Sequence, residues 1–193
     1  MGCSRELIST ISEISSLAAS CRDMLVIDVD EVSSRRSILT ERLRQLQQYP
    51  FSQTLNPESL VQIAEAKRLA ATLYLEERAP SVGQNSTLSK LKRKHLADAT
   101  INSLKLLPTT SAASLWPLYV LGSSTLDTED QRHFVLDRFD QLERSRKLGN
   151  IHYAKKFVER KIISQTVGFS GRSTSNISDA RGFHPNKRWI SLA

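Results

Sequence analysis

Cysteine, glycine and long apolar runs are all scarce in this sequence of 193 residues. Its two cysteines, Cys3 and Cys21, cannot form a disulfide framework, and they cannot form a zinc site without further ligands. Such low cysteine usage is typical of a reducing, intracellular compartment. With 7 glycines, the chain lacks the Gly-rich loops on which phosphate-binding α/β folds depend. Its apolar runs fall far short of the roughly 20 residues that span a bilayer, so we expect no membrane-spanning helix and no membrane partner.

Motifs of catalysis are missing as well. The sequence has no Gly-x-Ser-x-Gly elbow, no Walker loop and no dinucleotide fingerprint. Its four histidines lie in separate segments without metal-ligand spacing: His95, His133, His152 and His184. We therefore expect no enzyme activity, no cofactor and no metal in this chain. The alternative, a helical enzyme, requires a deep polar pocket that joins His95 or His133 to carboxylates.

Positive charge is concentrated in the second half of the chain. Residues 1–86 carry 9 Lys/Arg against 11 Asp/Glu, a net −2, whereas residues 87–193 carry 18 against 9, a net +9. The densest basic run contains Lys90, Lys92, Arg93 and Lys94. Three interpretations stay open for this run: recognition by a nuclear import receptor, contact with nucleic-acid phosphates, or simply the solvated face of a helix.

Apolar residues recur at helical spacing along most of the chain. They predict helices over about residues 4–22, 30–49, 57–77, 87–107, 114–121, 129–147 and 150–163. Expected capping residues are Ser4, Asp28 or Asp30, Asn56, Ser114, Thr128 with Gln131, and Asn150. Because no segment alternates with a period of two, the predicted fold is all-α: a bundle or solenoid-like array of six to seven antiparallel helices. In the fourth helix, Leu88, Leu91, Leu96 and Leu104 are expected to share the apolar stripe.

The stretch at residues 114–122 is apolar on every side, with six large apolar residues in nine positions. We predict an enclosed central helix here, in which Pro117 occupies the first turn and Gly122 forms a left-handed C-cap. The residues on which this prediction rests are Leu115, Trp116, Pro117, Leu118 and Gly122.

Three stretches together resemble the fungal-specific transcription factor domain. Residues 1–7 (MGCSREL) resemble its "G-C-small-x-E-L" helix, and residues 70–78 (AATLYLEER) resemble its "A-x-x-L-Y-L-x-x-R" helix. Residues 115–118 (LWPL), followed by Gly122, are similar to its "L-W-P-L-x-x-x-G" segment. The resemblance covers about residues 1–163. In this family the helical domain lies downstream of a zinc-cluster DNA-binding module that contains six cysteines.

The resemblance implies a helical regulatory domain over residues 1–165 and a poorly structured, flexible tail over 166–193. The implied function is control of RNA polymerase II transcription in the nucleus. It would act through effectors, through protein partners of the transcription machinery, or through a fused DNA-binding module, with DNA contacted only indirectly. The alternative function is a basic helical module that binds nucleic acid or protein.

The chain departs from the family pattern in two ways. Met1 aligns where the family's domain is already under way, so the sequence suggests a domain truncated at its N-terminus. Apolar stripes left uncovered in this way would favour self-association, including a homodimer. The two cysteines cannot supply the zinc cluster, so zinc is expected only for that missing module.

Overall fold

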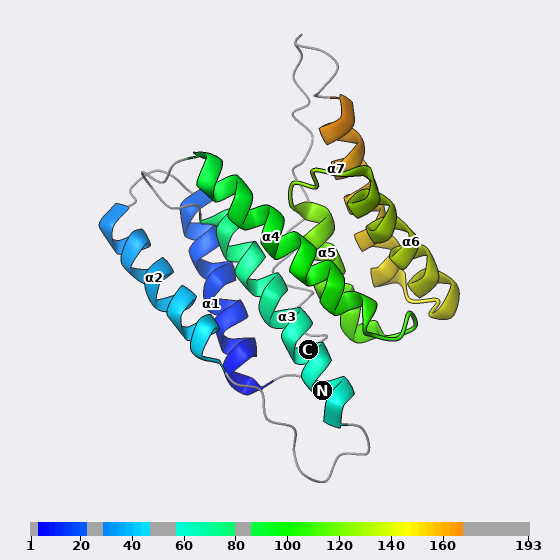
Figure 1. Cartoon of the computed structure of the whole chain (residues 1–193), viewed down its shortest axis with the longest axis horizontal. Coiled ribbons are helices and arrows are strands. Elements are labelled where there is room, and N and C mark those ends of the chain that lie inside the picture. Colours follow the sequence, from blue (N-terminus) through cyan, green and yellow to red (C-terminus); the bar gives the residue numbers. More distant parts are fainter. Residues whose placement is uncertain (1–3, 23–28, 47–56, 80–85, 168–193) are drawn as a thin grey trace.

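The chain forms an array of helices in which consecutive α-helices run in alternate directions (Figure 1). A computed structural model describes residues 4–22, 29–46, 57–79 and 86–167. These ranges contain α1 (Arg5–Arg22), α2 (Val29–Gln45), α3 (Pro57–Arg78), α4 (Ser86–Lys105), the 3-10 turn η1 (Ala112–Ser114), α5 (Leu115–Ser123), α6 (Glu129–Ser145) and α7 (Gly149–Val167). No strand occurs within them, so the all-α prediction is confirmed. Most of the predicted tail, residues 168–193, lies outside the described residues.

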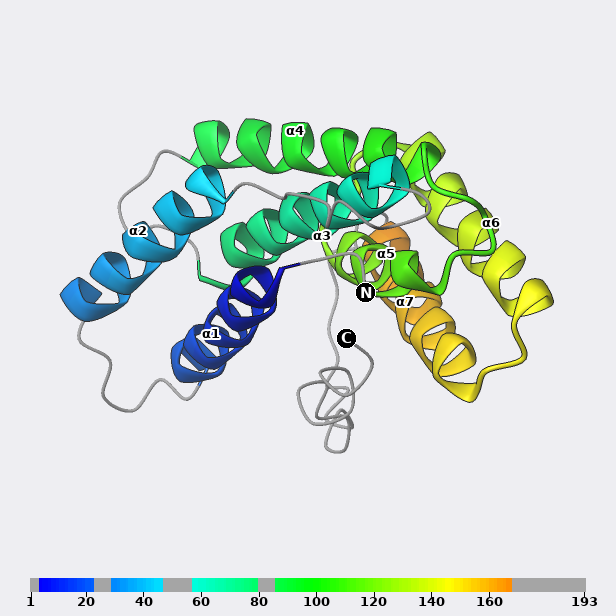
Figure 2. The ribbon, with the colours of Figure 1, turned by 90° about the horizontal axis from the view of Figure 1, so that it is seen from below.

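Helix α3 lies at the centre of the array and packs against α1, α2, α4 and α5. Figure 2 shows α1 and α2 on one side of it, α4 along it, and α6 and α7 on the other side. Its alanines permit this close approach from several directions, since a methyl group occupies little space between helices. The buried residues of the described chain separate into two apolar clusters, and α3 contributes side chains to both.

We name these clusters the N-terminal core and the C-terminal core. The N-terminal core consists of Leu7, Ile14, Leu17, Leu39, Leu43, Leu46, Ala71, Leu75 and Ala79. The C-terminal core draws on α3, α4, α5, α6 and α7 and the loops between them, and its fully buried side chains include Leu73, Leu104, Leu118, Leu121, Leu126, Phe139, Leu142 and Ile151.

Two of the predicted N-caps are confirmed. The Ser4 hydroxyl accepts a hydrogen bond from the Leu7 amide (3.2 Å) at the start of α1. At the start of α6, the Thr128 hydroxyl accepts from the Gln131 amide (3.3 Å), and the Gln131 side chain accepts from the Thr128 amide (3.4 Å). This reciprocal pair satisfies two amides that the helix itself leaves without partners.

Other predicted caps are wrong or lie outside the described residues. Helix α2 begins at Val29, so Asp30 lies within its first turn, while Asp28 and Asn56 are not described. Helix α7 begins at Gly149, one residue before the predicted cap Asn150, because the Ile151 amide already donates to the carbonyl of Leu148 (3.0 Å). Ser114 precedes α5, but its hydroxyl donates to the Ser111 carbonyl (2.6 Å) and closes the 3-10 turn.

The predicted apolar stripe of α4 is also wrong at its beginning. Leu104 is fully buried, whereas Leu88 and Leu91 are 62% and 54% exposed. Leu91 and Leu104 are separated by about 3.6 turns of helix, so their side chains point in different directions. The inward face of α4 is formed by Ala97, Ile101 and Leu104 instead.

Candidate regulatory site at the junction of the two cores

Helix α5 is enclosed by other helices, as its sequence predicts. It packs against α3, α4, α6 and α7. Leu115, Pro117, Leu118 and Gly122 are buried, and Trp116 is half-buried. Pro117 is the third residue of the helix, where its missing amide hydrogen costs no intrahelical bond. The ring of Tyr119 lies 5.5 Å from that of Phe157, which joins α5 to α7.

Gly122 has a different role from the predicted one. Helix α5 continues to Ser123, so Gly122 is an interior residue and not a C-cap. A Cβ atom at this position would lie 2.8 Å from Cγ2 of Val158 and 3.1 Å from Cγ1 of Val135. Glycine is therefore required because α6 and α7 approach the α5 backbone too closely for any side chain.

Two aromatic side chains join the cores. Tyr74 on α3 and Trp116 on α5 are half-buried, and each packs against both the N-terminal core and the C-terminal core. The Arg78 guanidinium lies 5.8 Å from the centre of the Tyr74 ring. We call these two rings the Tyr74–Trp116 junction. Through it, a displacement of α1 and α2 would be transmitted to the C-terminal core.

A buried carboxylate also lies on α3, two residues after Tyr74. Glu76 on α3 is 1% exposed, and its two oxygens each accept a hydrogen bond from a cation on a different helix. Oε2 bonds Nη2 of Arg36 on α2 (2.6 Å), and Oε1 bonds Nζ of Lys92 on α4 (2.6 Å). Nε of Arg36 also donates to the carbonyl of Ala79 (2.7 Å). Because a buried charge is costly without partners, this trio links α2, α3 and α4 through one site.

Sequence reasoning did not single out Glu76. A signal was present, since Glu76 follows Leu73 by three residues and Thr72 by four, and so lies near the inward face of α3. A carboxylate at such a position requires cationic partners, but the sequence alone does not say which helix supplies them.

The predicted import run lies on the first half of α4 and is split between several directions. Lys92 is bound to Glu76. No ion pair of Lys90, Arg93 or Lys94 is found among the described residues, and Lys90 and Lys94 are exposed. The structure therefore separates Lys92, which is bound to Glu76, from the exposed Lys90 and Lys94 and the half-buried Arg93.

The three histidines within the described ranges lie apart from one another and form no metal-binding group. His95 is exposed, Nε2 of His133 lies 3.6 Å from Glu129, and Nδ1 of His152 lies 2.7 Å from Oε1 of Glu143. His184 lies outside the described residues. Within the described ranges, no group of three or more His, Cys, Asp or Glu side chains is arranged to hold a metal ion.

An ion-pair cluster connects α6 and α7 instead. Nζ of Lys155 bonds Asp140 (2.6 Å) and Glu143 (2.8 Å). These hydrogen bonds raise the pKa of Lys155, while bonds from Lys155 and His152 lower the pKa of Glu143. All four groups are partly solvent-accessible, and their ion pairs connect α6 to α7.

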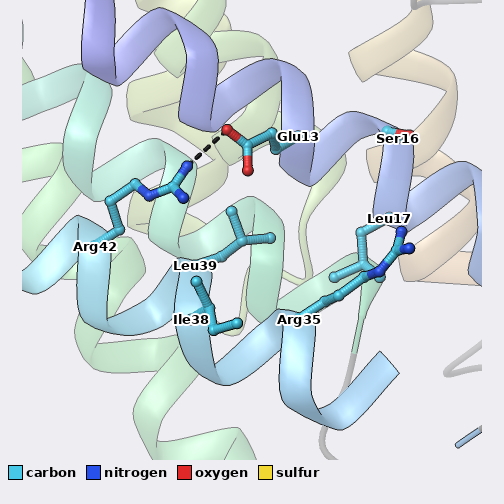
Figure 3. Close-up of a pocket in the computed structure, with 7 residues that line it drawn as sticks. All are labelled: Glu13, Ser16, Leu17, Arg35, Ile38, Leu39 and Arg42. Atoms are coloured by element: carbon cyan, nitrogen blue, oxygen red, sulfur yellow. Dashed lines mark hydrogen bonds and ion pairs between the residues drawn. The ribbon is translucent and has the colours of Figure 1, made fainter. Parts of the chain in front are cut away.

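A shallow groove of about 300 Å³ lies between α1 and α2 (Figure 3). Its lining residues are Glu13, Ser16, Leu17, Arg35, Ile38, Leu39 and Arg42. Glu13 is bound to Arg42 across it (2.6 Å), as the dashed line in Figure 3 shows. With its one carboxylate already paired, this groove holds no group placed for proton transfer.

The model of the fungal-specific transcription factor domain family matches residues 1–160. The chain belongs to this family. No curated protein and no solved structure matches the chain. The matched residues contain the N-terminal core, all of the C-terminal core except Ile162, the Tyr74–Trp116 junction and Glu76.

As a fungal-specific transcription factor domain, the chain has a role in transcription regulation. Of the three stretches that suggested the family, residues 70–78 lie on α3 and residues 115–118 with Gly122 lie on α5, while residues 5–7 of the first stretch begin α1. Among the described helices, none combines the length and the apolar composition needed to cross a bilayer.

Proposed function

We propose that this domain, over residues 1–165, controls RNA polymerase II transcription in the nucleus through contacts with protein partners. The partners are components of the transcription machinery or a DNA-binding module to which the domain is fused, so that DNA is reached only indirectly. The observation that carries the proposal is membership of the fungal-specific transcription factor domain family over residues 1–160. The mechanism needs no catalytic step and no cofactor, because regulation by contact requires only surface complementarity.

The test is a reporter assay in a fungal cell. The chain is fused to an unrelated sequence-specific DNA-binding module whose site lies upstream of a reporter gene. We expect reporter transcription to differ several-fold from that obtained with the DNA-binding module alone. The matched control carries Phe139→Ala, which removes a fully buried ring of the C-terminal core. Equal reporter levels from the intact fusion and the bare module, at equal protein abundance, would overturn the proposal.

Nuclear location is tested separately with a fluorescent fusion. Replacing Lys90, Arg93 and Lys94 by alanine should shift the protein towards the cytoplasm if this run directs import. Lys92 is left intact in this variant because its ammonium group is bound to the buried carboxylate of Glu76. A fusion that is nuclear before and after the substitution would assign import to another segment.

Direct nucleic-acid binding is the second candidate, favoured by the net positive charge of residues 87–193. Its basic segments are residues 90–94 at the start of α4 and residues 144–147 at the turn between α6 and α7. Figures 1 and 2 place these two segments at opposite ends of the molecule, which does not favour one continuous phosphate-binding surface. A steep dependence of nucleic-acid affinity on salt concentration would support this function, and a flat one would exclude it.

A further inference from the structure

The first half of α4 presents an apolar strip that no described helix covers. Leu88, Leu91 and His95 follow one another at spacings of three and four residues, so they lie on one face of the helix. All three are exposed, and the two leucines are among the most exposed large apolar side chains of the described chain. Figure 2 shows α4 at the rim of the molecule, with α3 on one side of it and no helix over its outer side.

Basic side chains border this strip along both edges. Lys94 follows Leu91 by three residues and so borders the strip along one edge, whereas Lys90 lies one turn before Lys94 and further round the helix. Lys92 follows Leu88 by four residues and lies along the other edge, where its bond to Glu76 fixes the side chain. Helix α4 carries five Lys or Arg residues against one acidic residue, Asp98. The surface is therefore an apolar ridge with a lysine along each edge, on a helix that is basic as a whole.

We propose that this face of α4 docks an amphipathic helix whose apolar ridge is flanked by Asp and Glu. The inference rests on the proposed function, since it specifies the chemistry of the protein partner. Leu88 and Leu91 would pack against the apolar ridge of the partner, as in helix-on-helix packing. Lys94 would pair with one of its acidic flanks, which helps to set the register of the bound helix.

Charge complementarity distinguishes this partner from other occupants of the same face. A nucleic-acid backbone would satisfy the lysines but would leave two exposed leucines without an apolar contact. A second copy of the α4 face would place its own lysines opposite these, which is unfavourable because like charges repel. An acidic amphipathic helix satisfies both the apolar ridge and its basic edges.

The test measures binding of a synthetic peptide to the full chain. The probe is a fluorescently labelled peptide of about 20 residues, long enough to form a helix, with leucines on one face and glutamates on both flanks. A second peptide has the same leucines with lysine in place of every glutamate. We expect the acidic peptide to bind at least about tenfold more tightly than the basic one.

Matched double variants locate the site. In Leu91→Ala/Lys94→Glu, affinity for the acidic peptide should fall about tenfold or more. The control Ile163→Ala/Lys156→Glu changes an equally exposed apolar residue and a lysine on α7, and it should change affinity less than about twofold. Circular dichroism checks that both variants stay folded, which is expected because all four side chains are exposed.

Each remaining outcome overturns the proposal. Equal binding of the acidic and basic peptides removes the role of charge. Equal losses in the two double variants place the binding elsewhere. Tighter binding of a DNA duplex than of the acidic peptide, lost in Leu91→Ala/Lys94→Glu, assigns the face to nucleic acid. A dimer in sedimentation velocity that this variant abolishes assigns it to a second copy.

The reporter assay separates failure of this inference from failure of the proposed function. If the fused chain alters transcription and Leu91→Ala/Lys94→Glu does so equally, the α4 face is not the docking site and the regulatory function stands. If no fusion alters transcription, the regulatory function fails, whatever the peptide binds.

Discussion

The two ends of the molecule differ in how their apolar residues are held. Among the described residues, the N-terminal core has nine buried apolar side chains, from α1, α2 and one side of α3, whereas the C-terminal core has twenty, from five helices. Helix α5 is surrounded by four helices, but α1 and α2 pack mainly on each other and on α3. The α1–α2 pair therefore depends on a small apolar surface plus the buried Glu76 site. We infer that it separates from the rest more readily than any other part.

Of the changes considered, Phe139→Ala should lower the free energy of unfolding the most. The ring is fully buried in the C-terminal core, so its loss should lower the free energy of unfolding by about 4 kcal/mol. Since the N-terminal core packs on α3 and on Trp116 of α5, which also belong to the C-terminal core, both cores should unfold together. Urea denaturation followed by circular dichroism measures the change, with Ile163→Ala, which alters an exposed side chain, as the control. An N-terminal core that survives alone would refute the dependence.

Glu76→Ala should cause the second-largest loss of stability, and the loss should be local to α1 and α2. It leaves the guanidinium of Arg36 in a nearly buried position without its anion, a loss of about 3 kcal/mol. Amide hydrogens of α1 and α2 should then exchange faster, while those of α5 and α7 keep their protection. Hydrogen exchange by mass spectrometry gives the result. Glu77→Ala, which changes the neighbouring and more exposed carboxylate, should have little effect. Uniform acceleration over all helices would contradict a local role.

Trp116→Ala should weaken the coupling between the cores. The indole contacts both, and because it is half-buried we expect a loss of about 2 kcal/mol. Unfolding should also lose its two-state character, with a calorimetric enthalpy that exceeds the van't Hoff enthalpy. Differential scanning calorimetry measures both enthalpies. Trp116→Phe, which keeps an aromatic ring at the junction, should restore most of the cooperativity. If Trp116→Ala unfolds in one two-state transition, the junction is not needed for coupling.

Acidification should have the smallest effect on stability, through protonation of Glu143 on α6 in the C-terminal half. Hydrogen bonds from Lys155 and His152 hold the pKa of Glu143 below its ordinary value of 4.5. The stability from this carboxylate is therefore present above pH 4.5 and is lost as the pH falls through its lower folded-state pKa. Glu143→Gln should be slightly less stable than the parent chain near neutral pH, and the difference should vanish in acid. Urea denaturation across this pH range tests the convergence; a constant difference would contradict it.

Much of the fold could be predicted from local signals. The start of α1 follows from the Ser4 hydroxyl, the start of α6 from the Thr128 capping box, and the enclosure of α5 from its all-round apolar surface. Each signal depends on groups a few residues apart, so one sequence carries it. The same reasoning failed for α4, because periodicity marks a face but does not reveal whether another helix covers it. Leu88 and Leu91 are therefore exposed although they continue an apolar pattern.

Most of the candidate site could not be predicted from the sequence, because it consists of contacts between residues that are far apart in the chain. Arg36 lies 40 residues from Glu76 in the sequence, and nothing local pairs them. Gly122 was predicted to be a C-cap, which is wrong; glycine is needed there because of Val158, on a helix that sequence spacing could not place against α5. Lys92 looked equivalent to its basic neighbours, and only the packing of α4 on α3 separates it from them.

The arrangement around Glu76 also bears on how this sequence can change over evolutionary time. Two donors serve one carboxylate, so losing either Arg36 or Lys92 leaves the other in place, and each single substitution is partly buffered. Once one of the two donors has been replaced, the other is the remaining partner of Glu76, so selection should retain it. Glu76 accepts from both donors, so its loss removes both bonds at once. Descendants of this chain should thus vary at position 36 or at position 92, but not at both.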